Sequence, residues 1–348
     1  TQNPQRAQKV VAAALGLNPA DVTVHVTLAG GGFGRRLSPD TELEAALIAA
    51  QVEGPVQVVW TREDDMTHDL YRPSSHHVLR GGLDEEGLPV AWHWHIQNTK
   101  TGRFDAGDMP AFAVKNYQVE YTHVPFILPQ GHWRATINSQ NPFVVHSFMD
   151  ELARAGGRDP VELWLQLLED GQSRRSWRSD FETDRQTAVI RAAAKQAGWG
   201  TPLPEGHGRG FAFFHGYQSY IAEIAEVHVQ GNEIHVDRVV CAVDCGTVIN
   251  PDLATAQVEG GIAFGLNAAL SQQITVKRGR VVEDNFDTFE LLQISQMPRI
   301  EAIIMPSGAA PGGLGEPPLP PIAPAVGNAI FDATGKRLRK LPFDLRDV

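Results

Sequence analysis

The sequence has few cysteines, no long apolar run and no excess of positive charge, and each absence excludes a class of protein. Cys241 and Cys245 are its only cysteines, too few for a disulfide framework, an all-cysteine metal site or an iron–sulfur cluster. No stretch reaches the roughly 18 consecutive apolar residues that a membrane-spanning helix needs. Lysine and arginine number 30 against 41 acidic residues, a net charge of −11, so a polyanion is repelled and no nucleic-acid partner is expected.

Several catalytic signatures are also absent. The glycine-rich residues 30–34 are not followed by the Lys-Ser/Thr pair of a P-loop, and they lack the full Gly-x-Gly-x-x-Gly pattern. No Gly-x-Ser-x-Gly elbow is present. The neighbouring histidines His76 and His77, and His93 and His95, lack the spacing of a zinc hydrolase. Nucleotide-binding loops, serine hydrolases and zinc hydrolases are therefore not indicated.

Glycine and proline are plentiful, with 33 and 23 residues in a chain of 348. Such a composition predicts many shaped loops, which is where functional sites usually lie. The chain starts at Thr1 and leads directly into a helical pattern without a signal-peptide core. We expect a chain that begins partway through a longer protein.

Apolar periodicity predicts alternating helices and strands in the first part of the chain. Helices are expected at residues 5–15 and 40–51, strands at 22–28 and 56–60, a hairpin at 75–97 that turns at 84–87, and short strands around 117–128.

The second part begins with a helical segment and ends with a strand, a glycine-rich loop and a helix. Helices are expected at 144–155, 160–168 and 185–197, a linker or long turn at 202–210, a hairpin of 220–229 and 234–243, a helix from Pro251, a strand at 301–305, a loop at 308–315 and a helix at 322–334. Hairpins mixed with packed helices predict an α+β fold with mixed sheets. We expect two subdomains, residues 1–204 with the helical middle segment and residues 205–348.

Two glycine-rich stretches could bind a ligand. Residues 30–34 (GGGFG) join a predicted strand to a helix, where glycines let backbone N–H groups approach an anionic ligand, although a tight structural turn has the same composition. Residues 311–318 (PGGLGEPP) place the single carboxylate of Glu316 in a stretch of glycine and proline. Glu316 could act as a general base, and the alternative is an exposed loop residue.

Two further stretches contain polar or sulfur groups. Arg134, in the aromatic-flanked loop 131–141, could bind a phosphate or an oxo group, or it could be a surface residue of a helix-capping loop. Cys241 and Cys245 favour two small buried apolar residues over a metal site.

Taken together and in this order, the stretches resemble the molybdopterin-binding large subunit of the xanthine dehydrogenase and aldehyde oxidase superfamily. The branch is that of isoquinoline 1-oxidoreductase beta subunits and related aldehyde dehydrogenases. The likeness covers essentially the whole chain, and it rests on residues 30–36 (GGGFGRR), 133–153 (WRATINSQNPFVVHSFMDELA), 241–266 and 312–343.

The resemblance implies a molybdenum hydroxylase that adds oxygen from water to an electron-poor carbon of an N-heterocycle or an aldehyde. Its cofactor would be molybdopterin with molybdenum, in the cytosine dinucleotide form. Glu316 matches the catalytic base, and Trp133, Phe214 and Tyr217 could line the substrate channel. The residues that match cofactor-binding positions are Gly31, Gly32, Phe33, Gly34, Arg134, Gln257, Gly260, Gly261, Gly312, Gly313 and Gly315, with Gly260 and Gly261 expected at a helix start suited to anionic groups.

Departures from the family pattern narrow the range of expected substrates. Arg35, Arg36 and Leu37 stand where xanthine-oxidising members carry an acidic residue, which disfavours purines. The loop after Arg134 lacks both a Gly-Phe-Gly motif and the cysteine of copper-containing carbon monoxide dehydrogenases, which disfavours carbon monoxide. The family's upstream glutamine-bearing cofactor motif is not among these residues. The rival hypothesis is therefore a cofactor-free relic or binding scaffold, and a third is an aldehyde dehydrogenase that feeds a cytochrome chain.

The resemblance also implies a partner subunit and a cellular location. Because two cysteines cannot hold an iron–sulfur cluster, electrons would leave through a small [2Fe-2S] subunit. Relatives in this branch often carry an upstream twin-arginine signal for export to the periplasm, and without such a signal the protein would be cytoplasmic.

Overall fold

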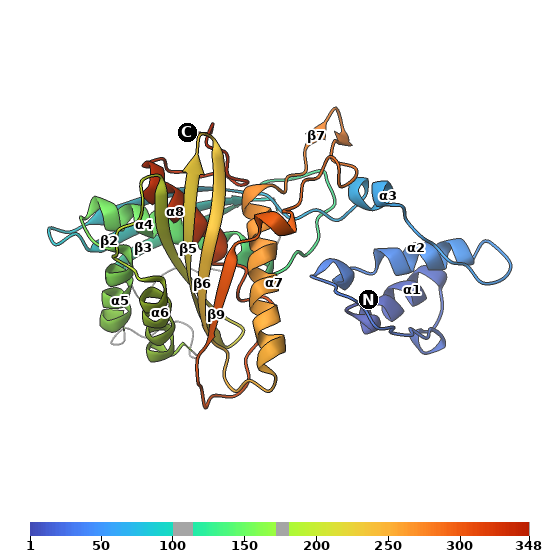
Figure 1. The fold of residues 1–348 in the computed structure, drawn as a ribbon. Coiled ribbons are helices and arrows are strands. Elements are labelled where there is room, and N and C mark those ends of the chain that lie inside the picture. Colours follow the sequence, from blue (N-terminus) through green and yellow to red (C-terminus); the bar gives the residue numbers. More distant parts are fainter. Residues whose placement is uncertain (100–113, 172–180, 348) are drawn as a thin grey trace. The chain divides into compact units, whose positions relative to one another are not determined.

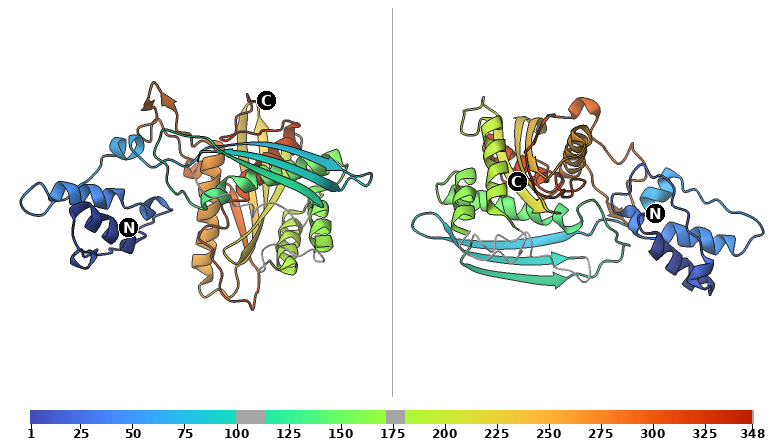
Figure 2. Two further views of the ribbon diagram at one scale, coloured as in Figure 1. Left: turned by 180° about the vertical axis from the view of Figure 1, so that it is seen from behind. Right: turned by 90° about the horizontal axis from the view of Figure 1, so that it is seen from below.

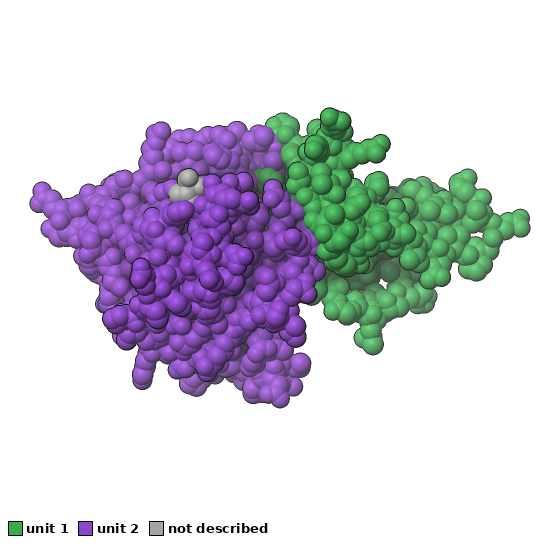
Figure 3. Space-filling model, turned by 45° about the horizontal axis from the view of Figure 1, so that its top comes forward, with its two compact units in different colours: residues 1–74, 125–136, 274–288 green, residues 75–124, 137–273, 289–348 purple. Residues whose placement is uncertain are grey.

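The computed structural model describes residues 1–99, 114–171 and 181–347. The chain divides into two compact units that interleave along the sequence (Figure 3). Unit 1 comprises residues 1–74, 125–136 and 274–288, and unit 2 comprises residues 75–124, 137–273 and 289–348. The subdomain division between residues 204 and 205 stays a prediction. None of the helices in the described ranges is both long and apolar enough for a membrane span.

Unit 1 contains short helices and little sheet. Its elements are α1 (Pro4–Leu15), η1 (Pro19–Asp21), η2 (Arg35–Leu37), α2 (Asp40–Ala49), α3 (Arg62–Thr67), β7 (Val276–Lys277) and β8 (Arg280–Val281). Helix α1 begins where the Asn3 side chain accepts a hydrogen bond from the Arg6 N–H, and it ends at Gly16 in a left-handed conformation. The helices predicted at 5–15 and 40–51 are confirmed within a few residues.

The strands predicted at residues 22–28 and 56–60 are wrong. Neither segment belongs to a β-ladder of the described residues. Val26 and Val59 are exposed, and Leu28 is fully exposed. An alternating pattern becomes a strand only when a neighbouring strand satisfies its backbone and something covers its apolar face, and neither condition is met here.

Unit 2 contains two mixed sheets. The first has the order β1 (Ser75–Leu83), β2 (Pro89–Asn98), β3 (Asn116–His123), with an antiparallel and then a parallel pairing. The second has the order β4 (His207–Gly216), β5 (Ser219–Gln230), β6 (Glu233–Asp244), β9 (Arg299–Ile304), and only its last pairing is parallel. The helices are α4 (Asn141–Ala155), α5 (Pro160–Gly171), α6 (Thr183–Ala197), α7 (Pro251–Leu270) and α8 (Ile322–Thr334), and η4 (Thr136–Ser139) and η5 (Ile294–Gln296) are single turns.

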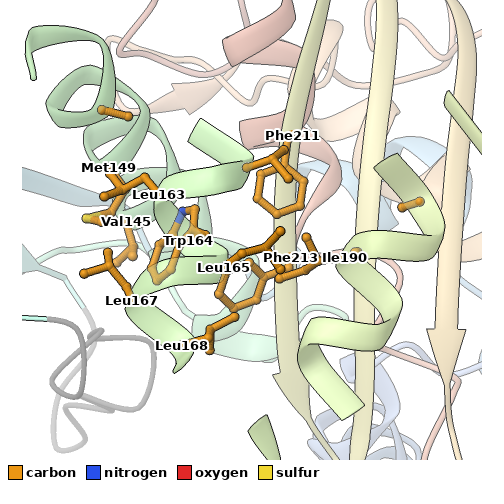
Figure 4. Close-up of a cluster of buried hydrophobic side chains, with 14 of the residues drawn as sticks. Val145, Met149, Leu163, Trp164, Leu165, Leu167, Leu168, Ile190, Phe211 and Phe213 are labelled. Carbon is orange, nitrogen blue, oxygen red and sulfur yellow. The ribbon is translucent and has the colours of Figure 1, made fainter. Parts of the chain in front are cut away.

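Helices cover both faces of the second sheet. Helix α6 lies against β5 and β6, α5 contacts both α6 and α4, and α4 reaches β1 and β4, whereas α8 lies against β4 and β5 with α7 beside it (Figures 1 and 2). One core cluster packs Val145, Trp164, Ile190 and Phe213 between the first sheet and the second (Figure 4). The other joins the opposite face of the second sheet to α7 and α8. This arrangement confirms the predicted α+β fold.

The segment predicted as a linker at 202–210 is partly wrong, because His207–Gly210 forms the start of β4. Its glycines serve close packing rather than flexibility. A Cβ at Gly208 would overlap the Ala329 carbonyl of α8, and one at Gly210 would overlap the Ala325 carbonyl. Glycine in a strand marks such a close backbone approach.

Candidate functional site

The predicted site residues form two groups, one in each unit. In unit 1, the loop of residues 30–34 lies against the loop of residues 131–134. Gly34 has a φ of 94°, and a Cβ there would lie 2.8 Å from the His132 carbonyl oxygen, so only glycine fits. The Arg134 guanidinium is buried and lies 5.5 Å from the centre of the Phe33 ring. Two motifs a hundred residues apart in sequence are thus brought together.

Both loops of unit 1 contain strained backbone. Phe33, Ala135 and Thr136 have φ values of 47°, 67° and 50°. Left-handed conformations are uncommon for residues other than glycine and tend to cluster at functional sites. Gln2, which the sequence did not single out, supports this loop because its Oε1 accepts a hydrogen bond of 3.1 Å from the Gly34 N–H.

The close packing around Gln2 and Phe33 leaves no space for a side chain at the neighbouring glycines. A Cβ at Gly32 would overlap the Gln2 side chain, and one at Gly31 would overlap the Phe33 ring. Gly31 and Gly32 therefore permit close packing within the loop itself.

Arg35 is a structural residue of the same unit. Its guanidinium donates two hydrogen bonds, of 2.9 and 2.8 Å, to the Asp40 carboxylate and a third to Asp69. Burial lowers the pKa of Arg35, but these two carboxylates more than offset it and raise the pKa above its ordinary value. The positive charge is thus compensated. Trp133 is half-buried, with the Arg72 guanidinium 4.8 Å from its ring centre.

In unit 2, the loop that precedes Glu316 is fastened to two neighbouring turns. The Gly312 N–H donates a hydrogen bond of 2.8 Å to the Cys245 carbonyl, and the Gly313 N–H donates one of 2.7 Å to the Tyr217 carbonyl. The Ser219 hydroxyl, which is fully buried, donates a 2.6 Å hydrogen bond to the Gly313 carbonyl. Gly312 and Gly313 have no room for a Cβ at these contacts.

The turn between β4 and β5 is strained. Tyr217 and Gln218 have φ values of 56° and 65°, and they form a two-residue loop between the paired residues Gly216 and Ser219. Such a type I′ turn normally carries Asn-Gly. Tyr217 is exposed at the tip, whereas Phe214 is buried with its ring close to Gly216. Lining of a channel by Tyr217, Phe214 and Trp133 stays a prediction.

The turn after β6 is held by an ion pair. Arg185 donates two hydrogen bonds of 2.7 Å to the Asp244 carboxylate, which also accepts the Gly246 N–H at 3.0 Å. Burial raises the pKa of Asp244, but the contact with Arg185 outweighs it and lowers the pKa below its usual range. Gly246 has a φ of 74°, and a Cβ there would overlap the Ala310 carbonyl.

Cys241 and Cys245 are free thiols buried in the core cluster of α7 and α8. The prediction of two small buried apolar residues is confirmed.

The prediction that Gly260 and Gly261 stand at a helix start is wrong. Helix α7 begins at Pro251, capped by the Asn250 side chain, which accepts a hydrogen bond of 3.1 Å from the Leu253 N–H. The two glycines therefore lie in the middle of α7. A Cβ at Gly261 would lie 2.8 Å from the Pro318 Cβ, whereas one at Gly260 would meet nothing within 4 Å.

Glu316 follows directly on this packed region. It is half-buried, its carbonyl accepts a hydrogen bond of 3.0 Å from the Leu319 N–H, and the prolines at 317 and 318 after it are buried. Gly315 is exposed, and a Cβ there would be in ordinary van der Waals contact with the Gln257 Oε1, at 3.8 Å. Unit 2 thus brings together Glu316, Gly315 and Gln257, with Gly312 and Gly313 anchoring the loop.

Comparison with known protein families identifies two matches in succession. A molybdopterin cofactor-binding domain model matches residues 1–166, and a second molybdopterin cofactor-binding domain model matches residues 168–298.

Similar proteins are larger than this chain. The beta subunit of isoquinoline 1-oxidoreductase from Brevundimonas diminuta is 30% identical over 98% of the chain and 45% of the relative. A membrane-bound aldehyde dehydrogenase [pyrroloquinoline-quinone] from Gluconacetobacter polyoxogenes is 30% identical over 97% of the chain and 48% of the relative. The chain spans just under half of these relatives. Among solved structures, quinoline 2-oxidoreductase from Pseudomonas putida 86 superposes with a TM-score of 0.79 at 14% identity, covering 95% of this chain and 68% of that one.

Proposed function

The chain belongs to the molybdopterin cofactor-binding family of the xanthine dehydrogenase and aldehyde oxidase type, and on that premise we propose that it is the molybdenum-binding part of a hydroxylase. The proposed reaction is oxidation of an N-heterocyclic aromatic compound, such as an isoquinoline, or of an aldehyde, with water as the source of oxygen. The two substrate classes are those named for the relatives, isoquinoline in one and an aldehyde in the other.

The residues present fit a bound pterin. A Cβ at Gly315, which precedes Glu316, would lie at van der Waals distance from the Gln257 amide oxygen, and a Cβ at Gly260 of α7 would meet nothing within 4 Å. In unit 1, Arg134 offers a guanidinium, whose fixed donors suit anionic oxygens. We assign cofactor contacts to Phe33, Gly34 and Arg134, and to Gln257, Gly260 and Gly315. The structural contacts of Gly31, Gly32, Gly261, Gly312 and Gly313 support an indirect role, in which they shape the loops and helix that present those residues. When bound, the molybdenum cofactor, proposed as the cytosine dinucleotide form, supplies the oxygen transfer and takes up two electrons.

Glu316 is the proposed general base. Its carboxylate would accept a proton as oxygen is added to the substrate, and general-base catalysis of this kind contributes about 100-fold to 10,000-fold in rate. The observation that carries this assignment is the fastening of its loop, at Gly312 and Gly313, to the Cys245 and Tyr217 carbonyls. With buried prolines on its other side, the Glu316 backbone is held in one position, as a base requires.

The electrons must leave the site, and this chain offers no cluster to take them, because both of its cysteines are buried apolar core residues. We propose a small [2Fe-2S] protein as the acceptor subunit.

The test uses the complete enzyme purified with its acceptor subunit. Glu316→Gln should lower turnover of an isoquinoline or aldehyde substrate by about 100-fold or more, with molybdenum content by mass spectrometry unchanged. Glu259→Gln, an exposed carboxylate of α7, is the matched control and should keep wild-type turnover. Wild-type turnover of Glu316→Gln would refute the base assignment. Absence of molybdenum from the wild-type complex would favour the alternative of a cofactor-free scaffold.

A further inference from the structure

Three histidines lie side by side on adjacent strands of the second sheet of unit 2, at the edge where β4 begins. His207 on β4 pairs with His228 on β5, and His228 pairs with His235 on β6. The ring centres of His207 and His228 lie 5.4 Å apart, and those of His228 and His235 lie 4.5 Å apart, both stacked. The three residues are far apart in sequence, so only the strand register brings them together.

A β-bulge adds a carboxylate to this row. The pairing of β5 with β6 shifts by one residue between Glu226 and Val227, which leaves Asp237 as the extra residue on β6. Bulges of this kind re-aim a side chain. The carboxylate oxygens of Asp237 lie 2.8 and 2.9 Å from the His228 Nδ1.

We propose that His207, His228 and Asp237 form a surface site for a divalent transition metal, with Zn²⁺ as the expected ion. One ligand atom from each residue lies within 4.8 Å of the other two. Tetrahedral coordination with bonds of about 2.0 to 2.1 Å places neighbouring ligands roughly 3.3 Å apart. His207 and His228 are half-buried and Asp237 is exposed, so the three side chains have room to rotate toward this shorter spacing.

The surroundings agree with a metal ligand set. The His207 Nδ1 lies 3.2 Å from the Glu205 carbonyl, and this contact leaves Nε2 for the metal, as outer-shell contacts of ligating histidines usually do. The His228 and Asp237 atoms that meet in a hydrogen bond would bind the ion in place of the shared proton. The neighbouring Arg238 does not compete, because it pairs with Glu226 and Glu301. Imidazole with a single carboxylate suits zinc, nickel and copper rather than calcium or magnesium.

This site is separate from the one proposed around Glu316. His207 is the first residue of β4, and the loop of Glu316 is fastened next to the other end of that strand, at Tyr217. Ten residues of strand span about 30 Å. A metal here would hold together three adjacent strands, so we assign it a structural role that does not depend on the hydroxylase activity.

The experiment titrates the metal-free chain with Zn²⁺ alone and follows binding by calorimetry. We expect one equivalent to bind, and His228→Gln to weaken the affinity by at least about 10-fold. The matched control is His93→Gln, because His93 also lies on a strand with a carboxylate, Glu120, at 3.4 Å. That control should bind Zn²⁺ as the wild type does, and circular dichroism should show that both variants are folded.

A second measurement identifies the metal ligands directly, without relying on a loss of binding affinity. Cu²⁺ should bind more tightly than Zn²⁺, and its electron paramagnetic resonance spectrum should show coupling to two imidazole nitrogens in the wild type and to one in His207→Gln. No stoichiometric binding of either ion, or a site that persists unchanged in His228→Gln, would overturn the proposal.

Discussion

Glu223 is an acidic residue in an apolar, fully buried environment. It lies on β5 between Ala212 of β4 and Cys241 of β6, and its side chain is fully buried. Neither carboxyl oxygen meets a nitrogen or oxygen donor among the described residues. Burial raises the pKa of Glu223 well above its ordinary value, and the Cys241 thiol lowers it only in part. The carboxyl group therefore keeps its proton to a higher pH than an exposed glutamate does.

The consequence is a stability that falls as pH rises. Above a pH of about 4.5 the unfolded chain releases this proton while the folded chain keeps it, so the folded state binds more protons and loses stability with increasing pH. Glu223→Gln should remove this contribution. Urea unfolding of the two proteins should show the variant gaining stability relative to wild type as the pH rises from 5 to 7.5. Glu85→Gln, in an exposed turn, should not change the slope, and parallel curves for wild type and Glu223→Gln would contradict the assignment.

Site residues differ in how far the sequence could predict them. Gly34, Arg134 and Glu316 stand in motifs, so local pattern was enough to single them out. Gln2 and Ser219 were missed because each acts through one hydrogen bond, to Gly34 and Gly313, across 32 and 94 residues of sequence. No local pattern encodes such a contact.

At the scale of elements, the apolar pattern predicted helices and strands correctly where another element of this chain packs or pairs with them. The hairpin of β5 and β6 and helix α8 agree with the pattern within a few residues. Strand β4 was obscured because Gly208 and Gly210, which admit the backbone of α8, read locally as a turn. The segments 22–28 and 56–60 failed for the opposite reason, since a strand-like pattern without a partner strand forms no ladder.

Helix α7 offers a test of this kind of packing with adjacent glycines. Gly261 faces Pro318, two residues from Glu316, whereas Gly260 faces open space. Gly260→Ala should stabilise the chain by up to about 1 kcal/mol, because alanine has the higher helix propensity. Gly261→Ala should destabilise it by about 1 to 3 kcal/mol through overpacking, despite the same gain in propensity. Thermal and urea unfolding of both variants measures the difference, and equal shifts would show that the contact with Pro318 does not constrain α7.

At the scale of the whole molecule, the two units bury very different cores. Unit 2 contains both large clusters of buried apolar side chains. In unit 1, the buried apolar residues of the described chain are small ones, Ala7, Ala12, Pro39 and Ala135. Large apolar side chains of unit 1 are instead exposed, among them Leu28, Leu47, Val59, Ile127 and Phe286. Burial of apolar surface is the main favourable term in folding, so unit 1 has little of its own to stabilise it.

This difference should appear in hydrogen exchange of the isolated chain. Helix α2 has no buried residue, so its amides should exchange through local opening at a cost well below global unfolding. The β5 strand, which is buried over most of its length, should exchange only through global unfolding of unit 2. We expect protection factors in α1 and α2 to be lower than in β5 by on the order of 100-fold or more, measured by mass spectrometry of peptic peptides. Equal protection in the two units would mean that the helices of unit 1 draw stability from contacts other than buried apolar side chains. In that case unit 1 would stay folded without any other surface packing against its exposed apolar side chains.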